Sequence, residues 1–374
     1  MTAQKSESLR TGENETKPVT NMGDYPDIEE FMAAANTGSR HGLEGFDEDY
    51  VDIVDYIIRC THKIWEEKGI GLIYSHYAHN ILIETSDGVT YGRDAVIAGS
   101  TRIMNAFPNV RLIGDDVIWS GNDQEGFHSS HRIYWTGTNI GYSVYGPPTG
   151  RAITRYGIAH CLVKENRIVE EWIARDEMAL VLQLGFNPHD LARRMAEIET
   201  NRQGNSAVGP LSQGEITRLR GQEPPPPLPE PTEEGFDIDY FVRRAFHEIW
   251  NWRLLNKVED YYTPRHWTYV PPNRYLYGLG EYKAHILSLL AAFSDLAVQV
   301  DHVCWVQDRD GRYRVAIRWT MQGTHDGPGW YGPPTGKRIR ILGITHQHIE
   351  NELITREWMV FDQFALLKQL YRSD

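Results

Sequence analysis

Cysteine is scarce in this chain of 374 residues, and lysine and arginine nowhere form a block. The three cysteines, Cys60, Cys161 and Cys304, lie far apart and include no Cys-x-x-Cys pair, which argues against a zinc-binding or redox motif. We therefore expect free thiols in a reducing compartment. The formal net charge of −13, from 38 basic and 51 acidic residues, argues against nucleic acid as a partner.

Long apolar runs are missing as well. No segment approaches the roughly 20 apolar residues that a membrane-spanning helix needs. The opening stretch, MTAQKSESLRTGENETKPVT, has no apolar core like that of a secretory signal. These absences predict a soluble, cytoplasmic protein without a membrane partner. Hydrophobic residues make up 41% of the chain, which is enough for real cores, and the length favours two domains.

A hexapeptide, Tyr-Gly-Pro-Pro-Thr-Gly, occurs at 145–150 and again at 331–336, an offset of 331 − 145 = 186 residues. Glu171-Trp172 and Glu357-Trp358 keep that offset, among other pairs. The pattern indicates tandem duplication of a unit of about 140 residues, the ordinary size of a domain. We expect the hexapeptide to be a hairpin connection, because Pro-Pro removes backbone donors that a phosphate cradle needs.

Composition divides the chain into four parts. Residues 1–47 form a polar N-terminal arm, 48–190 a first domain, 191–235 a linker and 236–374 a second domain. The linker contains the run PPPPLPEP, which favours an extended tether over a packed core.

In both units, helical patterns precede strand patterns. Apolar residues at three-and-four spacing predict a helix that ends near Gly69, and a second helix is predicted over 93–106, with its counterpart over 281–292. Branched and aromatic residues then predict four long strands, at about 110–120, 127–138, 152–163 and 168–176. This order is typical of an α+β fold with helices on one face of a curved antiparallel sheet.

The stretches GPPTGR, GIAHCLVKENRIVEEWIARDEMALVLQLG and GPPTGKRIRILGITHQHIENELITREWMVFDQFALLKQL resemble the SnoaL-like polyketide cyclase and ester cyclase group of the nuclear transport factor 2-like superfamily. The resemblance covers roughly 48–190 and 236–374. It implies two tandem cone-shaped α+β barrel domains, each with a curved sheet wrapped around helices and a pocket for a small-molecule substrate. It also implies an intramolecular pseudo-dimer through the outer sheet faces, with a further homo-oligomer left open.

The resemblance also implies which residues are catalytic. In such cyclases an Asp just before the closing helix acts as the acid/base, helped by a His on the preceding strand. The second unit matches this pattern fully, whereas the first has Leu162 at the His position and offers His160 two residues earlier. The candidate catalytic residues are therefore Asp362, His348, His346, Asp176 and His160.

Strand alternation places each candidate His on one face with apolar neighbours, such as Ile158 beside His160 and Ile344 beside His346. Such a face is expected to line a half-buried ligand cavity, although a hydrogen-bonded core histidine remains the alternative. A carboxylate in an apolar pocket has a raised pKa and can remove a proton next to a carbonyl, while an imidazole assists.

Aromatic and basic side chains near the expected pockets are candidates for substrate binding. For Arg132 a surface salt bridge is the alternative, and for the helix histidines a capping or surface role. No metal is expected, because His76, His79 and Glu84 do not recur in the second unit with ligand-type spacing. The candidate substrate-binding residues are Trp65, Trp250, His62, His247, Tyr156, Arg132, Trp172 and Trp358.

These observations predict an acid/base enzyme that needs no cofactor, a lyase or isomerase acting on a small carbonyl-containing substrate in the cone pocket. Aldol-type cyclisation, isomerisation and dehydration remain open. The alternative is a non-catalytic small-molecule-binding or scaffold protein with a duplicated cone fold. An epoxide hydrolase ranks third, because the arginine near each Asp is differently placed in the two units. The second unit, with more imidazoles, is expected to be the better catalyst.

Overall fold

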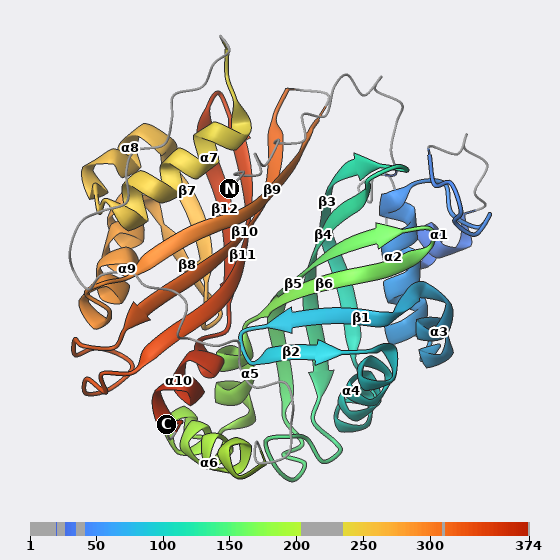
Figure 1. Cartoon of the computed structure of the whole chain (residues 1–374), viewed down its shortest axis with the longest axis horizontal. Coiled ribbons are helices and arrows are strands. Elements are labelled where there is room, and N and C mark those ends of the chain that lie inside the picture. Colours follow the sequence, from blue (N-terminus) through green and yellow to red (C-terminus); the bar gives the residue numbers. More distant parts are fainter. Residues whose placement is uncertain (1–19, 21–26, 35–41, 203–234, 309–310, 373–374) are drawn as a thin grey trace, which may run out of the picture.

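The computed structural model describes residue 20 and residues 27–34, 42–202, 235–308 and 311–372. The expected polar arm before residue 20 and the proline run fall outside these residues. Two domains of the same plan lie side by side (Figure 1).

Domain 1 has three helices before its first strand, one between β2 and β3, and two after its last strand. Its helices are α1 (Ile28–Ala33), α2 (Ile53–Trp65), α3 (Ile73–His76), α4 (Arg93–Ala106), α5 (Glu177–Leu184) and α6 (Pro188–Arg202). Its strands are β1 (Tyr77–Thr85), β2 (Gly88–Tyr91), β3 (Arg111–Asn122), β4 (Gly126–Thr138), β5 (Ala152–Lys164) and β6 (Arg167–Arg175). The helix predicted over 93–106 is confirmed, and the four predicted strands agree with β3 to β6 to within a few residues.

Domain 2 repeats this order. Its helices are α7 (Ile238–Phe246), continued by a π-helical turn (His247–Asn251), α8 (Val258–Tyr261), α9 (Gly278–Ala292) and α10 (Gln363–Tyr371). Its strands are β7 (Tyr262–Val270), β8 (Arg274–Tyr277), β9 (Ala297–Gln307), β10 (Tyr313–Thr324), β11 (Arg338–Glu350) and β12 (Leu353–Phe361).

Each sheet has six strands, in the orders β2-β1-β6-β5-β4-β3 and β8-β7-β12-β11-β10-β9. The long strands form antiparallel meanders, as predicted, but β1 pairs with β6 and β7 with β12 in parallel. The sheets are therefore mixed. The hairpins β1–β2 and β7–β8 were not expected from the sequence. Each adds two strands at the free edge of its meander, and a crossover connects it to the first strand of that meander.

The helices α2, α3 and α4 cover the face of the first sheet that is turned away from domain 2, and α7, α8 and α9 cover the equivalent face of the second sheet (Figure 1). The amphipathic α2 buries its apolar side there, with Ile53, Ile57 and Ile64 in the core of domain 1. The interior of each cone therefore lies between these helices and the sheet.

The outer faces of the two sheets pack against each other. A buried apolar cluster joins Ile158 and Ala174 of domain 1 to Tyr269, Ile344 and Trp358 of domain 2. The faces that we expected to line ligand cavities are thus the contact between the domains. Alternation assigns residues to faces correctly, but it does not say which face is turned toward the helices. The expected pairing through the outer sheet faces is what the structure shows.

A second contact lies at one end of the interface, where α6 packs against α10 (Figure 1). Glu199 of α6 accepts hydrogen bonds from Lys368 Nζ at 2.9 Å and Arg372 Nη2 at 2.8 Å. The helix α6 was not expected, since residues 191–202 were assigned to the linker. None of the helices in the described ranges has both the length and the apolar character needed to cross a membrane.

The repeated hexapeptides connect β4 to β5 and β10 to β11, as predicted. In the first copy, the amide and hydroxyl of Thr149 donate to Asn139 Oδ1 at 2.9 and 3.1 Å. In the second, Thr335 contacts Nδ1 of His325, which occupies the position of Asn139. Each loop is therefore held by a side chain at the end of the preceding strand.

Candidate functional site

The two predicted catalytic aspartates cap helices. Asp176 Oδ1 accepts from Ala179 N at 3.0 Å at the start of α5, and Asp362 Oδ1 accepts from Ala365 N at 2.8 Å at the start of α10. Burial raises the pKa of both carboxyls. Their catalytic role stays a prediction, and the capping role is visible in both copies.

Asp176 has further partners across the domain interface. Its Oδ2 accepts from Tyr269 Oη at 2.6 Å and from Asn273 N at 2.7 Å, both in domain 2. Three donors therefore hold this carboxylate in place. Within the described residues, Asp362 has no hydrogen-bond donor beyond the helix cap, so the two copies have diverged at this position.

The predicted catalytic histidines all lie at the interface between the sheets. His160 is fully buried beside Trp172, with ring centroids 5.9 Å apart. His346 Nε2 lies 2.8 Å from Ser130 Oγ of domain 1, and His348 Nε2 lies 3.7 Å from Asp116 Oδ2. The structure therefore groups these histidines with residues of the opposite domain, and no hydrogen bond joins them to Asp176 or Asp362 within the described residues.

Arg132 is an interface residue too. Only 2% of it is exposed, which corrects the surface alternative. Its Nε donates to Asp115 Oδ2 at 2.7 Å, and its guanidinium lies 3.5 Å from the ring centre of Trp358 in domain 2. The other aromatic candidates of the sheets, Tyr156 and Trp172, also face domain 2: Tyr156 contacts Tyr269 and Trp172 stacks under a guanidinium of β10.

The helix candidates divide between surface and interior. His62 lies 3.8 Å from Glu66 near the end of α2, and the ring of His247 lies 5.6 Å from that of Trp252. Trp65 is half-buried against the core. Trp250, in the π-helical turn, lines a pocket inside domain 2.

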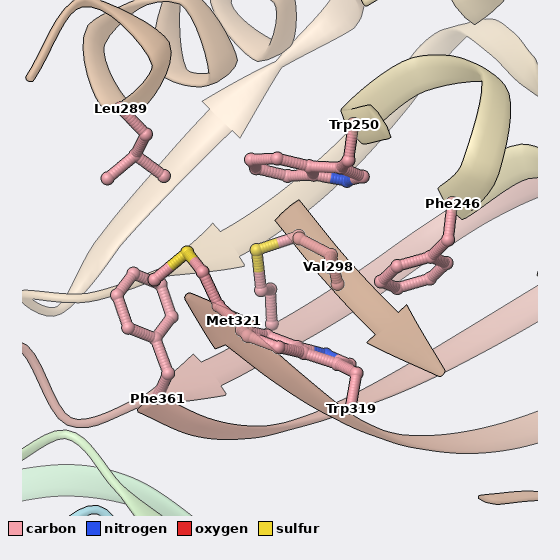
Figure 2. A pocket seen from close by; sticks show the side chains of 8 residues that line it. Phe246, Trp250, Leu289, Val298, Trp319, Met321 and Phe361 are labelled. Atoms are coloured by element: carbon pink, nitrogen blue, oxygen red, sulfur yellow. The ribbon is translucent and has the colours of Figure 1, made fainter. Parts of the chain in front are cut away.

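This pocket lies between the helices and the sheet of domain 2 and has a cavity volume of about 10 Å³, roughly the space of one water molecule. Figure 2 shows the indoles of Trp250 and Trp319 on opposite sides of it. Every side chain of the lining is aromatic or aliphatic, so the pocket suits an apolar molecule. The lining residues are Phe246, Trp250, Leu289, Val298, Trp319, Met321, Met359 and Phe361.

A glycine shapes one wall of the pocket. Gly343 of β11 lies opposite Trp319 of β10, and a Cβ at this glycine would come within 2.1 Å of the indole. The missing side chain lets the indole lie across β11, where Trp319 Nε1 donates to Thr345 Oγ1 at 2.9 Å. The ring is thereby fixed as part of the lining.

A buried carboxyl group continues the same face of β12. Glu357 alternates with Met359 and Phe361, which line the pocket. Its Oε2 accepts from Tyr262 Oη at 2.7 Å and from Gln347 Nε2 at 2.6 Å. Its Oε1 is buried and has no hydrogen-bond partner among the described residues.

Burial raises the pKa of Glu357 to about 7, although hydrogen bonds from Tyr262 and Gln347 favour the ionised form. The phenol oxygens of Tyr262 and Tyr282 are 2.7 Å apart, so the network extends to α9. Near neutral pH this carboxyl is therefore present in both protonation states. A group of this kind can both accept and donate a proton.

Domain 1 has the equivalent acid. Glu171 lies opposite Cys161 as Glu357 lies opposite Gln347, and both pairs keep the repeat offset. Burial raises the pKa of Glu171 to about 7 as well. Its hydrogen bond is weaker, because the donor is the thiol of Cys161, whose Sγ is 3.8 Å from Oε1.

The core around Glu171 is filled from the N-terminal side. Phe31, Leu43 and Phe46 are buried in it, and the ring of Phe46 contacts those of Tyr56 and Phe127. Domain 2 has no preceding segment of this kind among the described residues, since α7 begins three residues after residue 235. Among the described residues, an N-terminal segment therefore fills the interior of the first cone only.

The sequence model of the SnoaL-like polyketide cyclase family matches twice, over residues 55–184 and 241–370. The chain belongs to the SnoaL-like polyketide cyclase family. No relative was found among the curated proteins.

Three solved structures that are similar to this chain each cover 36% of it. A SnoaL-like protein from Jannaschia sp. CCS1 is 20% identical, with a TM-score of 0.32, and the match covers 36% of this chain and 91% of that one. TsrD from Streptomyces laurentii is 18% identical, with a TM-score of 0.32 and coverage of 36% and 98%. IdmH from Streptomyces antibioticus is 21% identical, with a TM-score of 0.31 and coverage of 36% and 98%.

Sequence reasoning missed Glu171 and Glu357 as site residues of this SnoaL-like chain. The signal was present, because both belong to the Glu-Trp pairs that recur at the offset of 186 residues. Alternation also places each Glu on the strand face opposite to its neighbouring Trp. In the sequence the pairs serve only to align the two repeats. The family resemblance points to the Asp positions as catalytic instead.

Proposed function

We propose that domain 2 is an acid/base catalyst that needs no cofactor and that Glu357 is its proton-transfer group. The substrate is a small, mostly apolar molecule with a carbonyl group, bound against Trp250 and Trp319. The observation that carries the proposal is the buried Glu357, with a pKa raised to about 7 and with Oε1 unpartnered, on the strand face that lines an apolar pocket.

In this reaction Oε1 of Glu357 removes a proton from the carbon next to the substrate carbonyl and leaves an enolate. In an isomerisation Glu357 returns the proton to another carbon of the substrate. In a cyclisation the enolate carbon attacks a second carbonyl, whose C=O π bond opens to an alkoxide, and Glu357 returns the proton to that oxygen. Tyr262 and Gln347 both donate hydrogen bonds to Oε2 and so fix the orientation of the carboxyl group. They are positioning residues, and Oε1 is left free to take the proton.

The size of the pocket limits the substrate. As the side chains stand, its cavity volume is only about 10 Å³, roughly the space of one water molecule. We therefore expect a small substrate, a single ring or a short chain, that is admitted only when the lining side chains move apart. The lining side chains are buried, so entry requires movement, and the π-helical turn that carries Trp250 is the element of the lining that departs from regular α-helix.

Proton exchange tests this role without knowledge of the product. The full chain is incubated in D₂O with cyclohex-2-enone or a small β-hydroxy ketone, and loss of the α-proton signal is followed by NMR. Wild type should exchange these protons, and Glu357→Gln should be slower by about 10²–10⁴-fold, the range for loss of a general base. Equal rates in the two proteins would contradict the proposal.

Glu171→Gln is the matched control, because it removes the equivalent buried acid from domain 1 and should leave exchange unchanged. Asp362→Asn and Asp176→Asn test the assignment implied by the family resemblance. If that assignment holds, turnover collapses in these variants while Glu357→Gln remains active. A ligand that binds tightly and shows no exchange in any protein supports the non-catalytic alternative.

A further inference from the structure

Three histidines from the two domains meet at the interface between the sheets. His128 lies in β4 and His160 in β5 of domain 1, and His302 lies in β9 of domain 2. One ring nitrogen of each lies within 4.8 Å of the other two. The ring centroids are separated by 5.5 Å for His128 and His160, 4.2 Å for His128 and His302, and 5.0 Å for His160 and His302.

These rings lack the hydrogen bonds that buried imidazoles ordinarily make. Nδ1 of His302 is buried without a partner in the part of the chain that the structure describes. Nδ1 of His160 is unpartnered as well, but it is the ring nitrogen other than the one next to His128. His160 Nε2 and His128 Nδ1 are 3.4 Å apart, beyond the usual range of roughly 2.7–3.2 Å for such hydrogen bonds. Nδ1 of His302 and the nitrogens of this long contact are therefore available to bind a ligand.

We infer that His128, His160 and His302 form a binding site for a divalent transition-metal ion, for which Zn²⁺ is the best match. Imidazole nitrogen is a preferred ligand of zinc, and Zn–N bonds of about 2.0–2.1 Å place two tetrahedral ligand atoms about 3.3 Å apart. The nitrogens of His160 and His128 already have this spacing. His302 is only partly buried, so its side chain can rotate to complete the set.

The charges around the cluster permit a dication. Arg318, stacked 3.6 Å from the ring centre of Trp172, is the positive group that acts on all three histidines. Asp301, Glu84 and Glu170 act on this arginine with the opposite sign. Lys164 adds a positive charge on the His128 side and Arg243 one on the His302 side. The acidic side chains therefore offset part of the charge of Arg318.

The site has a structural consequence, because its ligands come from both domains. A bound ion joins β4 and β5 to β9 and so favours the packed arrangement of the sheets. Three histidine ligands leave a fourth position for water. The metal site shares no residue with Glu357 and its hydrogen-bond partners. The inference therefore does not depend on the proposed function.

Metal titration of the untagged, metal-stripped full chain tests the site. Zinc binding is measured by calorimetry, and Co²⁺ is added separately because tetrahedral cobalt has a characteristic visible absorption. Wild type should bind one ion per chain. His128→Asn and His302→Asn should each weaken binding more than about 100-fold, since even outer-shell partners of a metal contribute 10–100-fold. Both residues are partly exposed, so the variants should fold.

His79→Asn is the control, because it removes an exposed imidazole of β1 outside the cluster and should bind as wild type does. Anomalous diffraction at the zinc edge from wild-type crystals gives a readout that needs no variant, with the peak expected between the three rings. Absence of binding at a large excess of zinc, binding that survives His302→Asn, or a peak elsewhere would overturn the inference.

Discussion

Glu171 and Glu357 are carboxyl groups placed where folding removes them from water. The side chain that lies opposite each acid on the neighbouring strand differs between the copies. It is a thiol in domain 1 and an amide in domain 2. Gln347 and Tyr262 occupy Oε2 of Glu357 and leave Oε1 unpartnered, whereas Glu171 has only the weak donor of Cys161. Several differences between the copies therefore give two related acids different surroundings.

The raised pKa values of these two acids should make the free energy of unfolding depend on pH. Each has a pKa of about 7 in the folded state against an ordinary 4.5, so the folded chain holds a proton that the unfolded chain has lost. Their contribution is fully present below about pH 4.5 and is lost as pH rises through about 7. At an upper limit of about 3 kcal/mol each, Glu357→Gln should visibly flatten the fall of unfolding free energy between pH 5 and 8.

Urea unfolding at several pH values measures this effect, with Glu171→Gln as the parallel case. The comparison must be between variant and wild type at each pH. Burial lowers the pKa of His160 and His346, and such groups change stability in the opposite direction below about pH 6.5. If Glu357→Gln and wild type show the same slope, the raised pKa of Glu357 is wrong.

At the scale of elements, equivalent helices begin in the same way but are held differently. The helices α5 and α10 both start at an aspartate that accepts from the third amide of the helix. Only Asp176 also receives donors from β7 and from the turn that follows it. The start of α5 is therefore part of the domain interface, while the start of α10 is a local cap.

This difference predicts unequal effects of cap removal. Asp362→Ala should lower the unfolding free energy by about 1 kcal/mol, and Asp362→Asn should change it little, because Asn caps equally well. Asp176→Ala should cost more, about 2–4 kcal/mol, because it leaves Tyr269 Oη and Asn273 N without their acceptor.

Asp176→Asn should also destabilise, since one end of its amide would present N–H groups to those two donors. Denaturant unfolding of the four variants gives the comparison. Equal losses at the two caps would show that the contacts of Asp176 with domain 2 do not form in solution.

On the scale of the whole molecule, the duplication places two outer sheet faces together, and charged residues are buried there with apolar ones. Arg132 lies between Asp115 and Trp358, while Asp116 contacts Arg314 and His348 from domain 2. Burial alone would raise the pKa of Asp116, but the nearby imidazole of His348 and the charges of Arg314 and Arg132 outweigh this and lower it.

Arg132→Met should therefore weaken the domain contact. Removing one partner of a buried pair costs about 3–5 kcal/mol, and the partial exposure of Asp115 places the expected loss near the lower end. Thermal unfolding should show a lower midpoint. The control, Arg312→Met, removes a half-exposed ion pair with Asp308 and should cost less than about 1 kcal/mol. Similar losses in both variants would contradict the importance of the Arg132 contact.

The sequence alone was sufficient for the repeat, the α+β order, the α4 boundaries and the role of the hexapeptide loops. These features depend on local chemistry, such as apolar spacing and the backbone limits of Pro and Gly. The α+β cone fold followed from the family resemblance and is shown by the family match and the structure. The parallel pairing of β1 with β6 was missed, because it joins strands far apart in the chain.

Only the tertiary structure decided which side of each sheet faces its helices. Strand alternation shows which residues of a strand share a face, as His160 does with Ile158, and the same holds for Glu171. It does not show which face of the sheet the helices cover. The packing distinguishes the two faces, because helices cover one face of each sheet and the neighbouring domain covers the opposite face. The histidines thus belong to the contact between domains and Glu357 to the interior, because burial and partners come from chain segments that local sequence does not bring together.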